Sequence, residues 1–152
     1  MTLTLEAIKA EHSKIGDMIA SFERRAQFEA RFPITVPAPM LLPGEKFACT
    51  VIEPNGTKYH LTLLPGDNDG IDHDGQLKWA AQQGGDLPDL TEQALLRKYL
   101  PDEFQKCAYW SKERHKTERG YAWCTGFRYG GQGCSHQDGK LRGRAVRRLV
   151  FE

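Results

Sequence analysis

The chain has 152 residues, 39% of them hydrophobic and 27% charged, a composition that is typical of one folded domain and excludes a disordered protein. No run of eighteen apolar residues occurs, so the sequence predicts no membrane span. The formal net charge is +1, but residues 67–105 carry three Lys or Arg against nine Asp or Glu, whereas residues 106–152 carry eleven against four. Because opposite charges in neighbouring segments favour compaction, we expect these segments to pair within one fold instead of binding nucleic acid.

Residues 1–32 are predicted to form a helix that assembles copies of the chain into a dimer or trimer. Thr4 can cap the helix, and one face then repeats at spacings of three and four residues. This seam consists of Leu5, Ile8, His12, Ile15, Ile19, Phe22 and Ala26. The alternative is an amphipathic helix that lies on the core of its own domain. We favour self-assembly because the seam is narrow and because residues 33–45, which contain four prolines, predict an extended connector.

The remaining residues, 46–152, are predicted to form one domain that begins with a β-hairpin. Residues 46–53 and 58–65 alternate β-branched and aromatic residues with polar ones, and Asn55-Gly56 between them is a strong hairpin signal. Four aspartates follow within residues 67–74, at a spacing that does not match a calcium-binding EF-hand loop. We expect a turn and an Asp-capped helix there, with a cation site left open as an alternative.

Helices and further strands follow, in an order typical of an α+β domain. Residues 74–85 predict one short helix that ends at two glycines. Residues 86–100 predict a second, with Asp89 and Glu92 in a capping-box relation at its start. Three strands are then expected, over residues 107–113, 120–129 and 141–151.

Four short motifs, kept in order between residues 58 and 150, resemble those of a known protein family. They are Gly84-Gly85 with Leu87-Pro88, Tyr109-Trp110-Ser111, Ala122-Trp123, and Arg144-Ala145-Val146-Arg147. The family consists of small phage and prophage proteins with a C-type-lectin-like domain, akin to the C-terminal domain of a collagen-like bacterial adhesin. The resemblance implies a C-type-lectin-like fold of antiparallel strands with two short helices. Formylglycine-generating enzymes resemble this fold distantly, but no local motif here matches their chemistry.

Strand alternation indicates which side chains of these motifs are structural. Trp110 and Trp123 are expected in the core, as strand tryptophans of this kind most often are. Over residues 141–150, neither set of alternating side chains is purely apolar, because arginines occur in both. We therefore expect at least one of these arginines to pair with the acidic segment 67–105 and not with a ligand.

The stretch Tyr121–Gly139 suggests a metal or catalytic site, but its spacing does not favour one. Cys124 and Cys134 are ten residues apart, and Cys134 with His136 forms only one loosely spaced pair. Structural zinc usually has two closely spaced pairs of ligands. No nucleophile elbow, phosphate loop or closely spaced carboxylate–histidine pair occurs. We therefore predict no metal, no cofactor and no catalytic residue. Because no secretory signal is recognisable, the four cysteines are expected to be free thiols of a protein made in the host cytoplasm.

The same stretch is typical of a contact surface, because arginine, aromatic and small polar residues lie on an expected Gly-rich loop. The predicted ligand-binding residues are Phe127, Arg128, Tyr129, Gln132, Ser135, His136 and Gln137. An ordinary solvated hairpin with Tyr129 half-buried is the alternative. The sequence thus predicts a non-enzymatic phage or prophage module that binds a protein or surface glycan of the host or virion, with association to the virion as a second location. The alternative function is an intracellular effector that binds and inhibits a host defence protein.

Overall fold

The structure, a computed structural model, describes residues 4–31 and 36–152. The chain divides into two compact units, Met1–Pro37 and Ala38–Glu152. The ends of the expected helix, residues 1–3 and 32, and the first part of the expected connector, residues 33–35, lie outside the described residues. The later part of the connector belongs to the second unit. Within the described residues, no helix combines the length and the apolarity that a membrane crossing requires.

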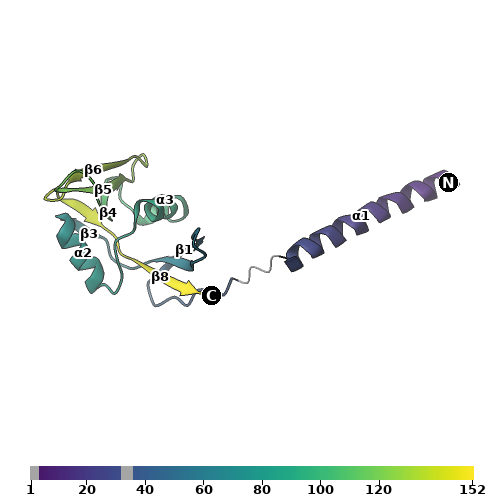
Figure 1. Cartoon of the computed structure of the whole chain (residues 1–152), viewed down its shortest axis with the longest axis horizontal. Helices are drawn as coiled ribbons and strands as arrows, with labels where there is room; N and C mark the ends of the chain where they lie inside the picture. Colours follow the sequence, from purple (N-terminus) through teal and green to yellow (C-terminus); the bar gives the residue numbers. More distant parts are fainter. Residues whose placement is uncertain (1–3, 32–35) are drawn as a thin grey trace. The chain divides into compact units, whose positions relative to one another are not determined.

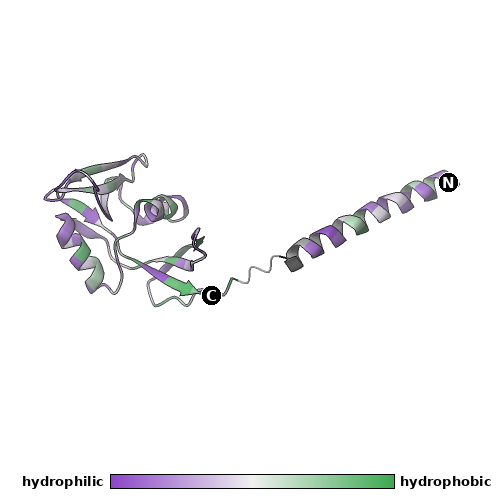
Figure 2. Cartoon of the chain, in the orientation of Figure 1, coloured by the Kyte–Doolittle hydropathy of each residue, from purple (hydrophilic) through white to green (hydrophobic). Residues whose placement is uncertain are grey.

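The first unit contains one helix, α1 (Leu5–Arg31), as the sequence predicts. Thr4 caps it, because its Oγ1 accepts a hydrogen bond from the backbone N–H of Ala7 at 3.3 Å. The large apolar side chains of the seam are between 51% and 67% exposed. Figure 2 shows hydrophobic and hydrophilic residues interleaved along α1. One copy of this unit therefore does not bury its own apolar seam.

The second unit opens with an antiparallel sheet of three strands in the order β1-β2-β8. These strands are β1 (Lys46–Ile52), β2 (Lys58–Leu63) and β8 (Val146–Phe151). The predicted hairpin joins β1 to β2, with Gly56 at a φ of 89° in its turn. Strand β2 pairs along its whole length with the C-terminal strand, from Lys58 opposite Phe151 to Leu63 opposite Val146. The two ends of this unit are therefore held in one sheet.

The second sheet has five strands in the order β3-β7-β4-β5-β6. They are β3 (Asn68–Ile71), β7 (Leu141–Gly143), β4 (Ala108–Arg114), β5 (Tyr121–Gly126) and β6 (Gln132–His136). Neighbouring strands are antiparallel except β4 and β7, which are parallel. With its helices, the unit has the α+β architecture that the sequence predicts.

Three expectations about this part of the chain are wrong. The segment 141–151 is not one strand, because it breaks at Arg144-Ala145 and its two halves, β7 and β8, lie in different sheets. At the break, the buried guanidinium of Arg144 donates hydrogen bonds to the backbone carbonyl groups of Glu103 and Leu64. Strand β6 occupies part of the expected Gly-rich loop, and β3 occupies part of the expected acidic turn.

Two helices, α2 (His73–Gln82) and α3 (Leu90–Tyr99), are followed by the 3₁₀ turn η1 (Pro101–Glu103). Both helices are capped by an aspartate, as the sequence predicts, and α2 begins one residue earlier than expected. Asp72 caps α2 by accepting a hydrogen bond from the N–H of Gly75 at 2.7 Å, and Asp89 and Glu92 form the capping box of α3. Helix α3 contacts β1, β4 and β5, whereas α2 contacts β3, β4 and β7 (Figure 1).

The Gly84-Gly85 motif ends α2 and lets the chain pass close to β8. Gly84 has a φ of 80°, in the left-handed region that glycine favours after a helix. A Cβ atom at Gly85 would collide with the carbonyl oxygen of Val146. Immediately afterwards, Asp86 and Val146 exchange two backbone hydrogen bonds, of 3.0 and 2.8 Å. The motif therefore allows the close contact between the end of α2 and the last strand.

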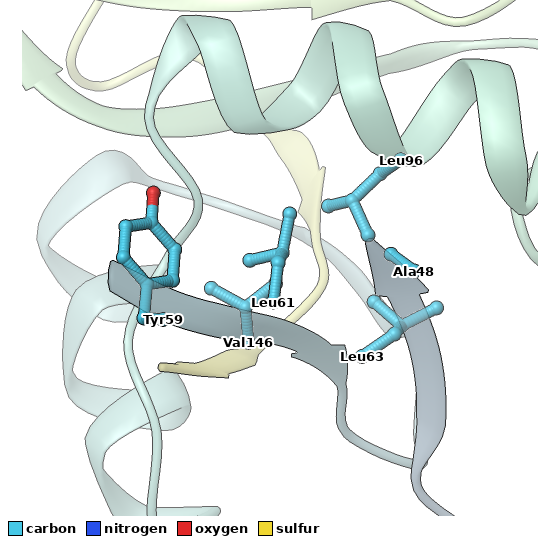
Figure 3. Close-up of a cluster of buried hydrophobic side chains, with 6 residues drawn as sticks. All are labelled: Ala48, Tyr59, Leu61, Leu63, Leu96 and Val146. Carbon is cyan, nitrogen blue, oxygen red and sulfur yellow. The ribbon is translucent and has the colours of Figure 1, made fainter. Parts of the chain in front are cut away.

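Two hydrophobic clusters fill the second unit, one beside each helix. Leu96 of α3 packs onto the three-stranded sheet, where Figure 3 shows it with Ala48, Tyr59, Leu61, Leu63 and Val146. Ala80 of α2 belongs to the other cluster, with Leu64, Leu87, Trp110, Ala122 and Ala145. Each helix thus covers its own part of the core.

The two tryptophans expected in the core differ. Trp110 is fully buried as predicted, whereas Trp123 is only half-buried. The two side chains lie on opposite faces of the five-stranded sheet, because Trp110 pairs with Cys124, the neighbour of Trp123 on β5. Trp110 packs in the cluster beside α2, whereas Trp123 stacks on His115 with ring centres 5.1 Å apart.

The carboxylate of Glu92 joins α3 to two strands. Its Oε1 accepts hydrogen bonds from the Tyr59 hydroxyl at 3.0 Å and from Arg148 Nε at 2.6 Å. Its Oε2 accepts from Arg148 Nη2 at 2.6 Å and from the backbone N–H of Asp89 at 2.9 Å. Glu92 is only 1% exposed, and burial alone would raise its pKa, but the hydrogen bonds from Arg148 and Asp89 hold the pKa below its ordinary value.

The other arginines near the C-terminus also bind acidic groups. Arg142 donates to Asp67 at 3.0 Å, and Arg147 donates to Glu45 through two nitrogens at 2.7 and 2.6 Å. Arg144 Nη2 lies 3.9 Å from Glu103 Oε2, so Arg142, Arg144 and Arg148 all pair with the segment 67–105. The prediction that at least one would do so is confirmed.

We expect Arg148→Met to lower the free energy of unfolding by about 3–5 kcal/mol, because it leaves the buried carboxylate of Glu92 without its cation. Arg114→Met is the matched control. Arg114 pairs with Asp74 where both side chains are more than half exposed, and such a pair contributes about 0–1 kcal/mol. Urea denaturation measures both losses. A loss for Arg148→Met no larger than that of the control would contradict the role assigned to Glu92.

Candidate functional site

The turn after β5, residues 127–130, presents an arginine and a tyrosine side by side. The backbone N–H of Phe127 donates to the Cys107 carbonyl at 2.9 Å, and that of Gly130 donates to the Gly126 carbonyl at 2.7 Å. Tyr129 is 80% exposed, so the interpretation of it as half-buried is wrong. The guanidinium of Arg128, also exposed, lies 5.1 Å from the centre of the Tyr129 ring.

Arg97 of α3 lies across this turn. Its Nε donates to the carbonyl oxygen of Phe127 at 3.3 Å. Gly130 has a φ of 81°, and a Cβ atom there would lie 2.8 Å from Arg97 Nη1. The backbone conformation therefore favours glycine at this position, and the guanidinium of Arg97 packs directly against it. The contact fixes the turn against the C-terminal half of α3.

Phe127 is buried beneath the turn, so the prediction that it forms part of an exposed patch is wrong. It is 7% exposed, and its ring stacks on that of Phe104 with centres 4.0 Å apart and planes 13° apart. Tyr109 packs edge-on against Phe127 at 5.0 Å. Phe104 directly follows η1, far from Phe127 in the chain. The sequence alone therefore did not indicate that the two rings would stack. The guanidinium of Arg144 lies 5.3 Å from the centre of the Phe104 ring.

A pocket of about 430 Å³ opens beside this aromatic pair. Its lining residues are Arg97, Pro101, Asp102, Phe104, Lys106, Phe127 and Arg128. The lining therefore contains three cations, one carboxylate and two aromatic rings. Within residues 36–152, none of the three cations lies within ion-pair distance of a carboxylate. We call this hollow the basic pocket.

The structure separates the predicted ligand-binding residues into groups along β6. Gln132, at the start of β6, donates to the carbonyl oxygen of Leu90 at 2.7 Å. His136, at the end of the strand, packs its ring against Tyr121. The remaining two, Ser135 and Gln137, lie beside it. Four residue steps along a strand span about 13 Å. Gln132 adjoins the turn, because it pairs with Thr125 at the end of β5, but Ser135, His136 and Gln137 do not form one patch with it.

Five residues that line the basic pocket were not indicated by the sequence: Arg97, Pro101, Asp102, Phe104 and Lys106. A cation in the last turn of a helix complements the helix dipole, so Arg97 has an ordinary structural explanation. Arg97 precedes Phe127 by 30 residues, and no short motif links the two. The sequence signal that could have indicated these residues is the cluster of basic and aromatic residues over positions 97–106.

The cysteine and histidine side chains of the same region do not converge. Cys134 and His136 lie two residues apart on β6 and share one face of the sheet. Cys124 pairs with Gly133 in the ladder, so its side chain points to the opposite face. In the part of the chain that the structure describes, no three His, Cys, Asp or Glu are grouped to hold a metal ion. All four cysteines lie in that part and are free thiols.

The aspartates of residues 67–74 bind groups of the protein itself. Arg142 donates to Asp67 at 3.0 Å and to Asp69 at 2.9 Å. The hydroxyl of Tyr109 also donates to Asp67, at 2.8 Å. The other two aspartates cap α2 and pair with an exposed arginine of β4. Because all four carboxylates already bind groups of the protein, the geometry favours a structural role for this acidic segment over a cation site.

A scan against protein-family models finds no match for this chain, and a search of the curated proteins finds no significant match.

We expect Cys134, which is exposed on β6, to be the first thiol to react with an aromatic disulfide reagent in the native protein. Burial raises the pKa of Cys49, Cys107 and Cys124, so less of their reactive thiolate is present at neutral pH. After unfolding without reductant, all four thiols should react. Simultaneous reaction of all four in the native protein, or fewer than four after unfolding, would contradict this assignment.

Proposed function

We propose that the chain is a non-enzymatic recognition module of a phage or prophage protein, which binds a host or virion molecule at the turn that follows β5. The observation that carries this proposal is the pair formed by Arg128 and Tyr129, both exposed and both on a turn held by Arg97. Arginine and tyrosine are enriched among the residues that dominate binding energy at interfaces. A turn fixed before binding loses little conformational entropy when a partner docks.

The fold proposed for this module is C-type-lectin-like, as the sequence resemblance implies. The motifs that carry the resemblance have structural roles that support it. Gly85 permits close contact with β8, and Trp110 is fully buried in the core. The antiparallel strands and two short helices of the second unit are compatible with that fold. Residues that build a scaffold in this way specify the fold, whereas the ligand depends on the surface.

We further propose that α1 associates with α1 of other copies of the chain, so that one assembly presents several turns. The large apolar side chains of its seam stay exposed in a single unit. Their spacing of three and four residues is self-complementary between helices. A coiled coil of this length is marginal by itself, and simultaneous binding by several modules would increase the strength of attachment without new contacts.

To test this association, we expect the full chain to sediment as a dimer or trimer and Ile15→Asp with Ile19→Asp to sediment as a monomer. A charge on the seam must be desolvated when helices associate, whereas a charge outside it stays in water. Lys14→Asp, outside the seam on the same helix, is the control and should keep the oligomer. A monomeric wild-type chain, or an unchanged oligomer in the seam variant, would show that α1 does not assemble the protein.

Recognition at the turn is tested by capture of binding partners from host cells and from purified particles. Arg128→Ala with Tyr129→Ala should reduce partner capture at least about thirtyfold, since loss of one such anchor often costs about 2 kcal/mol. The melting temperature should stay nearly unchanged because both side chains are exposed. Arg119→Ala with Tyr121→Ala removes the same two residue types near the far end of β6 and should have little effect.

Normal capture by the Arg128 and Tyr129 variant would place the contact surface elsewhere. The origin of the partner separates the two functional classes. A partner in purified particles supports a virion-associated module, and a cytosolic host protein whose activity falls on binding supports the effector.

A further inference from the structure

We infer that the basic pocket binds the phosphate group of a small phosphomonoester. This inference rests on the proposed recognition function and names the chemistry of its ligand. It follows from the charges around the basic pocket, the hydrogen-bonding capacity of Arg97, and the aromatic wall.

The charges of the basic pocket are unbalanced. Arg97, Lys106 and Arg128 line it together with a single carboxylate, that of Asp102, which leaves an excess of two positive charges. Elsewhere in the unit, Arg142, Arg147 and Arg148 are bound to carboxylates. A phosphomonoester carries about −1.5 to −2 charges at neutral pH and therefore matches the excess.

Arg97 is positioned to bind an oxyanion through two nitrogens. Its Nε is occupied by the carbonyl oxygen of Phe127, which fixes the plane of the guanidinium. Within residues 36–152, its Nη1 and Nη2 make no hydrogen bond. A guanidinium presents donors in a planar fork that fits phosphate oxygens, and such charge-assisted hydrogen bonds are stronger than neutral ones. Lys106 and Arg128 add donors from two other segments of the chain.

The aromatic wall suits the organic part of the ester. Phe104 and Phe127 stack on each other and both line the basic pocket. Apolar walls lower the local dielectric constant and so strengthen the attraction between the cations and a bound anion. A volume of about 430 Å³ lies within the range of about 300–1,000 Å³ that small-molecule sites occupy. A phosphate on an aromatic or sugar group therefore fits the chemistry better than the free ion.

The test is a calorimetric titration of the full chain with phenyl phosphate, inorganic phosphate, phenyl sulfate and phenyl β-glucoside. Phenyl phosphate should bind with a dissociation constant below about 1 mM, and inorganic phosphate more weakly because it lacks the ring. Phenyl sulfate has one charge fewer and should bind at least about fivefold more weakly, while the neutral glucoside should not bind. Equal affinity for the sulfate and the phosphate ester would overturn the assignment, as would no binding of phenyl phosphate.

Lys106→Gln with Arg128→Gln should weaken phenyl phosphate binding at least about tenfold, because both cations line the basic pocket and their loss removes two donors for the phosphate oxygens. Lys98→Gln with Arg119→Gln makes the same change in net charge outside the basic pocket. An equal loss of phenyl phosphate affinity in this control would show general attraction to a basic surface and would contradict the inference.

Tyr129→Ala separates this inference from the proposed function. It leaves all three cations in place, so phenyl phosphate binding should persist even where partner capture is lost. Absence of phenyl phosphate binding, together with partner capture that depends on Tyr129, would refute the phosphate site and leave the recognition function standing.

Discussion

The arrangement of the folded unit depends on a buried ion pair, Glu92 with Arg148. Removing two charges from water costs free energy, and their attraction offsets that cost only where the remaining hydrogen-bonding positions are also filled. Glu92 meets this condition, because each of its carboxylate oxygens accepts two hydrogen bonds. The donors belong to β2, to β8 and to Asp89, which caps α3. Satisfying one carboxylate therefore fixes both where α3 begins and where it lies on the three-stranded sheet.

The position of α3 then decides what the rest of the helix can reach. Gln93, adjacent to Glu92, turns to the other sheet, where its amide donates to the carbonyl groups of Tyr109 and Trp110. One turn later, Arg97 reaches the turn after β5 and holds its backbone. The basic pocket thus lies where Arg97, near the end of a helix that is fixed at its start, meets a turn of the five-stranded sheet. This is why the candidate site combines residues from segments that are far apart in the chain.

Features that depend on a few neighbouring residues could be predicted from the sequence. The Asn55-Gly56 hairpin and the capping box of Asp89 and Glu92 are of this kind, because every group that forms them lies within a few positions. The glycines of β6 predict a loop, yet the backbone groups of this segment pair with β5, as those of any residue can. The sequence around Phe127 predicts an exposed side chain, because the ring that covers it, Phe104, comes from another segment of the chain.

By itself, the sequence determined the α+β order of elements, the apolar seam of α1, and the pairing of C-terminal arginines with the acidic segment. These properties follow from periodicity, capping residues and the distribution of charge, all of which can be counted along the chain. Only the tertiary structure decided which cations are neutralised and which are not. Arg148 pairs with Glu92, which lies 56 residues earlier in the chain. By contrast, Arg97, Lys106 and Arg128 line one pocket that contains a single aspartate. The reason is that electrostatic pairing depends on distance in space, and that distance is set by the packing of α3 against two sheets.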